Sequence, residues 1–146
     1  MPIRLMTLAD YDRVRALWLR TPGLGLNTVD DSREGIARYL ARNPTTCFVA
    51  EEGEVLVGAI LAGHDGRRGT IGHTAVDAAH QRQGIGRQLV EHVLRAMADA
   101  QITKVNLVVF ARNAFGNAFW ERLGFTARTD LIYRNRALQE LERVDT

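Results

Sequence analysis

The chain has 146 residues, 46% of them hydrophobic, and its 19 Lys and Arg against 17 Asp and Glu leave a net charge of +2. This length and composition suit one folded domain over residues 1–146, and the small charge argues against a protein that binds nucleic acid. No apolar run reaches the ~20 residues that a membrane span needs, so we expect neither nucleic acid nor membrane as a partner. The one cysteine, Cys47, excludes an internal disulfide, and the N-terminus lacks a signal-peptide core, so we expect a cytoplasmic protein.

Apolar patterns predict alternating strands and helices along the chain. In chain order, the expected elements are a strand over 3–6; a helix after Thr7 that ends at Thr21-Pro22-Gly23; a helix after Ser32 that ends before Asn43-Pro44; strands over 47–51, 55–62 and 70–76; a helix that fades near Ala100; a strand over 104–110; a helix over 113–123; a strand over 126–133; and a charged tail over 137–144 with a frayed helix. The density of β-branched residues over 104–110 is typical of a sheet centre. The fold class is therefore α/β, an α+β mixed sheet flanked by helices in the order βααβββαβαβ.

A glycine-bearing loop joins the strand over 70–76 to the following helix. It reads Gln81-Arg82-Gln83-Gly84-Ile85-Gly86, with Arg87 behind it. Free N–H groups at such a helix start attract a phosphate, and glycines let the anion approach the backbone closely. The loop lacks the Gly-Lys pair of a Walker loop, and Leu89 stands where a dinucleotide fingerprint has its third glycine. A phosphate loop of another kind is predicted, with a simple glycine turn as the alternative.

The pattern [QR]-x-x-G-x-[GA] after a strand resembles the signature loop of the GNAT N-acetyltransferase superfamily, which binds the pyrophosphate of acetyl-coenzyme A. The segment from Asn113 to Phe125 is similar to a second motif of that family, with Trp120 at its aromatic position and Gly116 at its alanine position. The element order matches as well, so the resemblance covers nearly the whole chain. It implies a GNAT-like fold, acetyl-coenzyme A as cosubstrate, and direct acetyl transfer to the amine of a small molecule or a protein N-terminus.

The resemblance also implies where acetyl-coenzyme A binds. The backbone amides of residues 82–87 would hold the pyrophosphate, while the strand before them would part from its neighbour and admit the pantetheine arm. The Val76 N–H would stabilise the oxyanion, and Asn113 would both cap its helix and contact the arm. The implied cofactor-binding residues are Thr74, Ala75, Val76, Gln81, Arg82, Gln83, Gly84, Ile85, Gly86, Arg87, Asn113 and Trp120.

The catalytic residues are less fully specified. Trp120 stands where many relatives carry a tyrosine that protonates the thiolate, and indole can donate a hydrogen bond but cannot act as an acid. The strand over 105–110 lacks the glutamate that some relatives use as the base. We therefore predict His73 as the base, because imidazole with a pKa near ~6.5 accepts a proton at neutral pH, with Asp65 as amine anchor or alternative base. The alternatives are a structural histidine at 73, a turn former at 65 and a core aromatic at 120.

The sequence is also compatible with other functions. The missing tyrosine and glutamate also fit a non-catalytic acyl-coenzyme A sensor or interaction domain of the same fold, and a generic nucleotide-binding module is a weaker third hypothesis. His80 and His92 lack partners at metal-ligand spacing, so no metal is expected. Exposed strand edges and the C-terminal segment allow a homodimer. The acceptor amine depends on the loop over 23–31, the second helix and the loop over 65–69, for which sequence supplies no rule.

Overall fold

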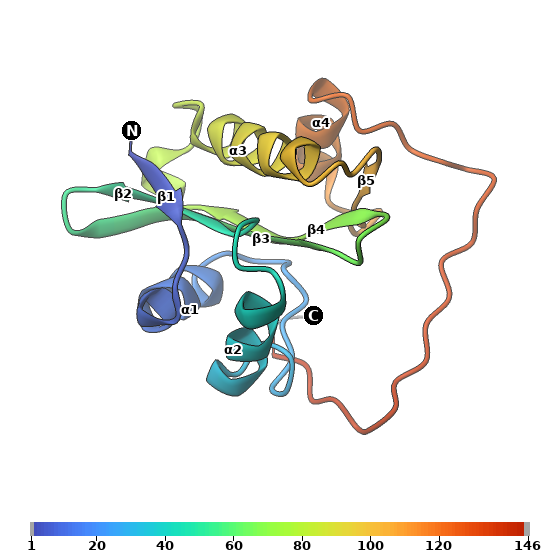
Figure 1. Ribbon diagram of the computed structural model, residues 1–146, viewed down its shortest axis with the longest axis horizontal. Helices are drawn as coiled ribbons and strands as arrows, with labels where there is room; N and C mark the ends of the chain where they lie inside the picture. Colours follow the sequence, from blue (N-terminus) through green and yellow to red (C-terminus); the bar gives the residue numbers. More distant parts are fainter. Residues whose placement is uncertain (1, 145–146) are drawn as a thin grey trace.

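The computed structural model describes residues 2–144 and places a five-stranded sheet between two pairs of helices (Figure 1). The strands are β1 (Ile3–Leu5), β2 (Phe48–Glu52), β3 (Val55–His64), β4 (Gly69–Val76) and β5 (Val105–Asn106), and they lie in the sheet in chain order. Helices α1 (Tyr11–Leu19) and α2 (Arg33–Arg42) cover one face, and α3 (Ile85–Asp99) and α4 (Ala114–Arg122) cover the other. Short 3-10 turns are η1 (Leu8–Asp10) and η2 (Ala78–His80).

The pairing of the strands confirms the predicted fold class. Strands β1 to β4 are antiparallel, and β5 runs parallel to β4 after the crossover through α3. None of the helices in the described part of the chain is long and apolar enough to cross a membrane.

Each face of the sheet buries its own apolar core. The core beneath α1 and α2 includes Val14, Leu17, Trp18, Ile36, Leu61 and Ala75. The core beneath α3 and α4 includes Ile60, Ala62, Ile85, Leu89, Val93, Met97 and Trp120. Because side chains alternate along a strand, β3 supplies residues to both cores and reads as a continuous apolar run. The sheet centre is therefore β3.

Helix boundaries follow the capping residues. The Ser32 side chain accepts a hydrogen bond from the Gly35 N–H at 3.0 Å, and Asn113 accepts one from the Gly116 N–H at 2.8 Å. Gly124 follows Leu123, the C-cap of α4, and has φ +90°, the left-handed conformation that glycine adopts without strain. The helix starts predicted at Ser32 and Asn113 are confirmed.

The predictions for the last third of the chain are partly wrong. The strand expected over 104–110 shortens to β5, and it lies at the sheet edge instead of the centre. The strand expected over 126–133 does not form, because the chain beyond β5 carries no ladder to which a sixth strand could pair. Its large apolar side chains are exposed: Leu131 by 63%, Ile132 by 77% and Tyr133 by 71%.

The C-terminal segment is also not the frayed helix predicted over 137–144. It returns as extended chain to the loop between α1 and α2, where Arg143 and Asn27 form an isolated antiparallel bridge. Glu142 O accepts a hydrogen bond from the Thr28 N–H at 3.0 Å. The backbone of the tail therefore forms hydrogen bonds with a distant loop. The pattern of charges over 137–144 could not predict that pairing.

Asp10 is a buried carboxylate that ties β1 to α1. Its side chain is 3% exposed and accepts hydrogen bonds from Arg4 at 2.7 and 2.9 Å, from Arg13 at 2.9 Å and from the Thr7 N–H at 2.9 Å. These contacts, the hydrogen bonds from Arg4 first, lower the pKa of Asp10 from 3.8 to about 2. Asp10 therefore links Arg4 of β1 to Arg13 of α1.

We expect Asp10→Asn to reduce the free energy of unfolding at pH 7 by about 2 kcal/mol, since a charge-assisted network is lost. The folded-state pKa lies below the unfolded one, so this stability is present above about pH 4 and disappears as the pH falls toward about 2. Urea denaturation at pH 7 and near pH 2 measures the difference. The matched control is Asp12→Asn, which removes an exposed ion pair with Arg33. A deficit of the same size at both pH values would contradict it.

Candidate active site

Strands β4 and β5 part directly after their first residues. Gly69 pairs with Val105 and Thr70 with Asn106, and the pairing between the two strands ends there within the described residues. The rest of β4, residues 71–76, has partners on β3 alone. The backbone groups on the far edge of β4 are therefore free to bind an extended ligand where a neighbouring strand would otherwise lie.

Val76 directs its N–H toward this unpaired edge. The Asp77 N–H donates to Val57 O on β3 at 2.8 Å. Successive residues of a strand point their N–H groups to opposite edges, so Val76 and Thr74 point away from β3, whereas Ala75 points toward it. The side chain of Ala75 is buried in the core beneath α1 and α2. Of the three predicted backbone contacts, this geometry favours Thr74 and Val76.

The loop after β4 enters α3 through left-handed backbone. Arg82 has φ +66° and Gly84, the N-cap, has φ +81°. No side chain caps the helix, and within residues 2–144 the N–H groups of Ile85, Gly86 and Arg87 find no acceptor. The first turn of α3 therefore presents free donors and the positive end of the helix dipole.

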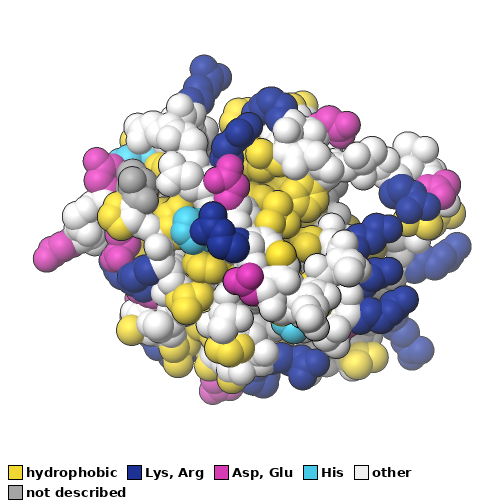
Figure 2. All heavy atoms as spheres, turned by 45° about the horizontal axis from the view of Figure 1, so that its top comes forward, with side chains coloured by type: hydrophobic (Ala, Val, Ile, Leu, Met, Phe, Trp, Pro, Cys, Tyr) yellow, Lys and Arg dark blue, Asp and Glu magenta, His cyan; other side chains and the backbone are white. Residues whose placement is uncertain are grey.

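The side chains of the loop border this helix start. Arg82, Gln83 and Arg87 are exposed, while the Gln81 side chain turns back and donates to Val76 O at 3.4 Å. Figure 2 shows apolar side chains gathered on the face that carries α3 and α4, with Lys and Arg side chains around them. An apolar surface edged by cations suits a ligand that joins an aliphatic arm to phosphates.

Gly86 has a packing role in addition to its predicted role in letting an anion approach the backbone. A Cβ at this position would lie 3.1 Å from the Phe119 ring and 3.7 Å from Val76. Glycine thus lets α3 approach α4 and the end of β4. Trp120 is 9% exposed, with the rings of Phe119 and Phe125 at centroid distances of 4.9 and 5.2 Å. Trp120 therefore packs as a core aromatic, and its predicted contact with the thioester stays a prediction.

On the opposite face of the sheet, His73 forms a close pair with Asp31. His73 Nε2 lies 2.8 Å from Asp31 Oδ1, and the two side chains are 18% and 11% exposed. The other carboxylate oxygen accepts the Asn27 N–H at 2.9 Å, and the Tyr11 hydroxyl donates to the Asp31 carbonyl at 2.6 Å. The Trp18 ring packs edge-on against the imidazole at a centroid distance of 5.1 Å. The pair, hereafter the dyad, is therefore held on several sides.

A β-bulge sets the direction of His73. Ile60 pairs with Thr74 while Ala62 pairs with Ile71, so Gly72 and His73 together oppose Leu61 alone. A bulge twists the strand locally and re-aims the side chains beside it. The same bulge explains why simple alternation along β4 could not assign His73 to a face.

Asp65 lies in the turn between β3 and β4 and does not partner His73. Its Oδ1 accepts the N–H groups of Arg67 and Arg68, both at 2.8 Å. These hydrogen bonds, that of Arg68 first, hold the pKa of Asp65 below its usual value. Such a carboxylate is a weak base, which favours the turn-forming interpretation over a catalytic one. The acid that contacts His73 is Asp31, which sequence reasoning missed because no periodicity links positions 42 residues apart.

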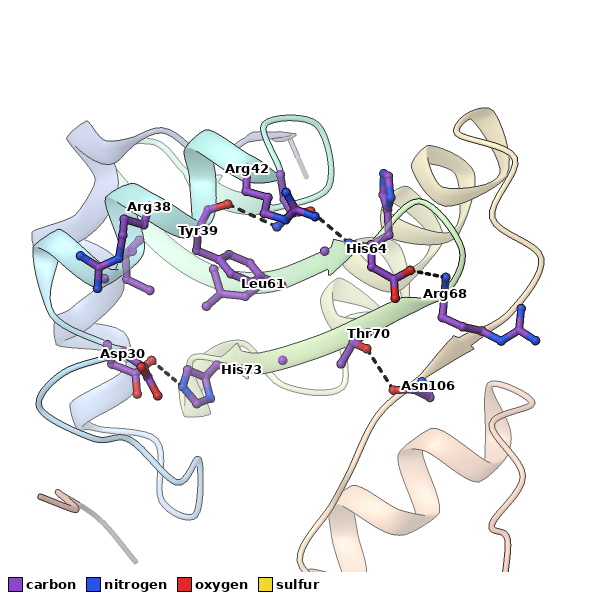
Figure 3. Close-up of a pocket in the computed structure, with 17 residues that line it drawn as sticks. Asp30, Arg38, Tyr39, Arg42, Leu61, His64, Arg68, Thr70, His73 and Asn106 are labelled. Atoms are coloured by element: carbon purple, nitrogen blue, oxygen red, sulfur yellow. Dashed lines mark hydrogen bonds and ion pairs between the residues drawn. The ribbon is translucent and has the colours of Figure 1, made fainter. Parts of the chain in front are cut away.

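A cavity of about 830 Å³ opens in front of the dyad, between α2, the loop before it and strands β3 and β4 (Figure 3). His73, which contacts Asp31, lies at one end, and Arg42 and Arg68 line the cavity farther along. Burial raises the pKa of Tyr39 in the cavity wall, so its phenol stays protonated at neutral pH. Among residues 2–144, no group of three His, Cys, Asp or Glu side chains could hold a metal ion.

Comparisons with known proteins agree with this geometry. The family model of the acetyltransferase (GNAT) family matches residues 11–125. Acetyltransferase SG1711 of Sodalis glossinidius is 27% identical over 140 residues, which cover 96% of this chain and 97% of that protein.

Two solved structures share the fold. AAC(6')-Iy in complex with the bisubstrate analogue CoA-S-monomethyl-acetylneamine has a TM-score of 0.72 at 19% identity, covering 93% of this chain and 98% of that one. Naa20 of Chaetomium thermophilum in complex with a bisubstrate analogue has a TM-score of 0.73 at 21% identity, covering 85% and 70%. Because the family model spans most of the chain, the chain belongs to the acetyltransferase (GNAT) family, as its two motifs predicted.

Proposed function

We propose that this protein moves the acetyl group of acetyl-coenzyme A to an amine by direct attack of the amine on the thioester. The observation that carries the proposal is the parting of β4 and β5 beside the uncapped start of α3. Family membership supports it, as does the structure of AAC(6')-Iy, which shares the fold and is in complex with a coenzyme A-based bisubstrate analogue. No relative named above supports the alternative of a non-catalytic sensor.

The first turn of α3 would bind the pyrophosphate. The N–H groups of residues 82–87 are the donors, and each hydrogen bond to a charged group contributes about 1.5–3 kcal/mol. The exposed side chains of Gln81, Gln83, Arg82 and Arg87 border this site. The pantetheine arm would run along the open edge of β4, near Thr74 and Val76, with Asn113 at the start of α4 as a further contact.

Three tasks fall to the chain once the thioester is bound. The Val76 N–H would stabilise the negative charge that develops on the carbonyl oxygen. His73 would take the proton of the amine, and the bond from its Nε2 to Asp31 would leave Nδ1 free to accept it. Trp120 would pack beneath the sulfur. Coenzyme A brings a thiol whose pKa near ~8.5 makes its thiolate a tolerable leaving group, so no side-chain acid is assigned.

The acceptor would enter from the face of α1 and α2, through the cavity before the dyad. Its amine belongs to a small molecule or a peptide N-terminus. We also propose that residues 1–146 act as one domain and that the protein works in the cytoplasm, where thiols stay reduced. The thiol of Cys47 is free and buried, and burial raises its pKa to about 11. The exposed apolar side chains over 131–133 could support a homodimer, which light scattering would measure.

Calorimetry and thiol release test the activity directly. We expect freshly purified apo protein to bind acetyl-coenzyme A, and a thiol reagent to detect free coenzyme A when a suitable amine is added. Absence of both signals would refute the proposal. Binding without turnover on a broad panel of amines, amino acids, polyamines and peptides would instead favour the sensor.

A further inference from the structure

Residues 142–144, hereafter the docked segment, lie against the loop between α1 and α2. Glu142 O accepts the Thr28 N–H at 3.0 Å, and the Val144 N–H donates to Leu26 O at 3.0 Å. Figure 1 shows how the chain reaches this place: it leaves α4 on one face of the sheet, runs around the outside of the molecule as extended chain, and comes to lie beside the loop on the other face. The docked segment is therefore on the acceptor side of the sheet, although it follows α4 in sequence.

Asn27 lies between the docked segment and Asp31. Asn27 and Arg143 form the antiparallel bridge, and both hydrogen bonds to the docked segment come from the residues on either side of Asn27. In a pair of this kind, the N–H and carbonyl of the central residue point away from the partner strand. The Asn27 N–H accordingly donates to Asp31 Oδ2 at 2.9 Å. The loop thus bonds to the docked segment along one edge and to the Asp31 carboxylate along the other.

Asn27 also fixes the turn that leads to Asp31. Its side-chain oxygen accepts the N–H groups of Val29 at 3.0 Å and Asp30 at 2.7 Å, and its side-chain nitrogen donates to the Asp30 carboxylate at 3.0 Å. The other oxygen of Asp31 lies 2.8 Å from His73 Nε2. A displacement of Asn27 therefore moves the carboxylate that contacts the imidazole.

The docked segment reaches the dyad from behind and not through the acceptor cavity. Val144 lines a smaller cavity of about 330 Å³ together with Trp18 and Asp31, and none of the three described residues 142–144 lines the cavity in front of the dyad. All three are exposed, so they add little to the core. Two hydrogen bonds at the surface give little net stability, so the segment can leave the loop while the core stays folded.

We propose that the docked segment is a positioning element of the reaction: it holds Asn27, Asn27 holds Asp31, and Asp31 orients the imidazole of His73. This rests on the proposed function, in which His73 takes the proton of the amine. When the segment leaves the loop, the Asp31 carboxylate loses its place beside Nε2, and proton transfer slows. The binding of acetyl-coenzyme A, which the proposed function assigns to the start of α3, stays unchanged.

Prolines in the full chain test the docking. Glu142 and Val144 direct their backbone groups to the loop, so Glu142→Pro with Val144→Pro removes the donor to Leu26 O and places rings against the loop. We expect this double variant to lower kcat about 10- to 100-fold, the effect of a small misplacement of a reacting group. The matched control is Leu138→Pro with Glu140→Pro. These positions have the same spacing and are exposed, and their N–H groups find no acceptor within residues 2–144, so kcat should stay unchanged.

A double-mutant cycle shows whether the docked segment acts through Asp31. In an Asp31→Asn background, the prolines at 142 and 144 should cause little further loss of kcat, because the carboxylate that they displace is already gone. A loss by the same factor in both backgrounds would mean a general structural effect and would contradict the proposal.

Amide hydrogen exchange gives a readout that does not depend on activity. The double variant should speed exchange of the Thr28 N–H, whose acceptor is Glu142 O, and also of the Asn27 N–H, whose acceptor is the Asp31 carboxylate. Fast exchange at Thr28 with unchanged exchange at Asn27 would mean that the loop keeps its shape without the docked segment, and the inference would be overturned.

The outcomes separate this inference from the proposed function. An unchanged kcat in the double variant overturns the inference and leaves the acetyltransferase activity intact. A loss of kcat that comes with weaker binding of acetyl-coenzyme A, or with a Tm below that of the control, also overturns it, since the effect is then not confined to the dyad. No turnover of any amine by the unsubstituted protein refutes the proposed function, and exchange at Asn27 then still decides whether the docked segment holds Asp31.

Discussion

Replacing His73 with alanine is expected to lower kcat by about 10²- to 10⁴-fold, the usual contribution of a positioned base. The binding of acetyl-coenzyme A should stay the same, because His73 contacts Trp18 of α1 and lines the cavity, whereas the start of α3 packs on the opposite face of the sheet. Asp31→Asn should lower kcat by a comparable factor, since the amide cannot stabilise the imidazolium and, by donating to Nε2, favours the tautomer that carries its proton on Nδ1. Steady-state kinetics with saturating acetyl-coenzyme A measures both effects.

A purely structural role for His73 must be told apart from a chemical one. The imidazole packs on Trp18, so its removal also leaves a small void. Added imidazole should restore part of the activity of His73→Ala if the lost group is a base, and should not do so if only packing was lost. His92→Gln, in α3 on the other face of the sheet, is the control and should leave kcat unchanged. If neither His73→Ala nor Asp31→Asn changes kcat, a bound water must take the proton.

The second large effect is expected at Gly84. Gly84→Asp should weaken binding of acetyl-coenzyme A by at least about 100-fold, because it places a carboxylate beside the pyrophosphate in the field of the helix start. Gly84→Asn is the matched control and should weaken binding by about 10-fold or less. Both residues tolerate the left-handed backbone at φ +81°, and a Cβ there meets only the end of the Gln88 side chain, at 3.9 Å. The two variants thus differ mainly in charge.

Calorimetry gives the two affinities, and thermal unfolding supplies the check on folding. A carboxylate at the start of a helix stabilises it, so the Asp variant should melt no lower than the Asn variant. A loss of affinity without a loss of stability is therefore the specific signature of an anion site. Equal affinity in the two variants and the unsubstituted protein would mean that the pyrophosphate binds elsewhere.

Much of the fold could be predicted because its signals are local. Ser32 and Asn113 bond to backbone groups three residues away, and the glycine loop lies between a strand and a helix that sequence periodicity reveals. The family motifs lie in these same local segments. What sequence reasoning missed depends on contacts between distant parts of the chain.

The dyad shows most clearly which contacts the sequence alone does not predict. His73 could be nominated from its chemistry and place in β4, but Asp31 reaches it from a loop that is held by the Asn27 N–H within the loop and by the Tyr11 hydroxyl from α1. Asp65 was nominated because it is close in sequence, and the structure engages it in a turn. The strand predicted over 126–133 failed for a related reason: β-propensity does not supply the partner that a strand requires.

The chain has two tryptophans, and the sheet places them on opposite sides. Trp18 touches the imidazole of the dyad, while Trp120 sits among the rings that adjoin Gly86 and the start of α3. The intrinsic fluorescence of the protein therefore has one source on the acceptor side of the sheet and one on the acetyl-coenzyme A side. A chain that keeps Trp18 alone reports on events at the acceptor, one that keeps Trp120 alone reports on the thioester side, and stopped-flow emission from the pair resolves the order in which the two substrates arrive.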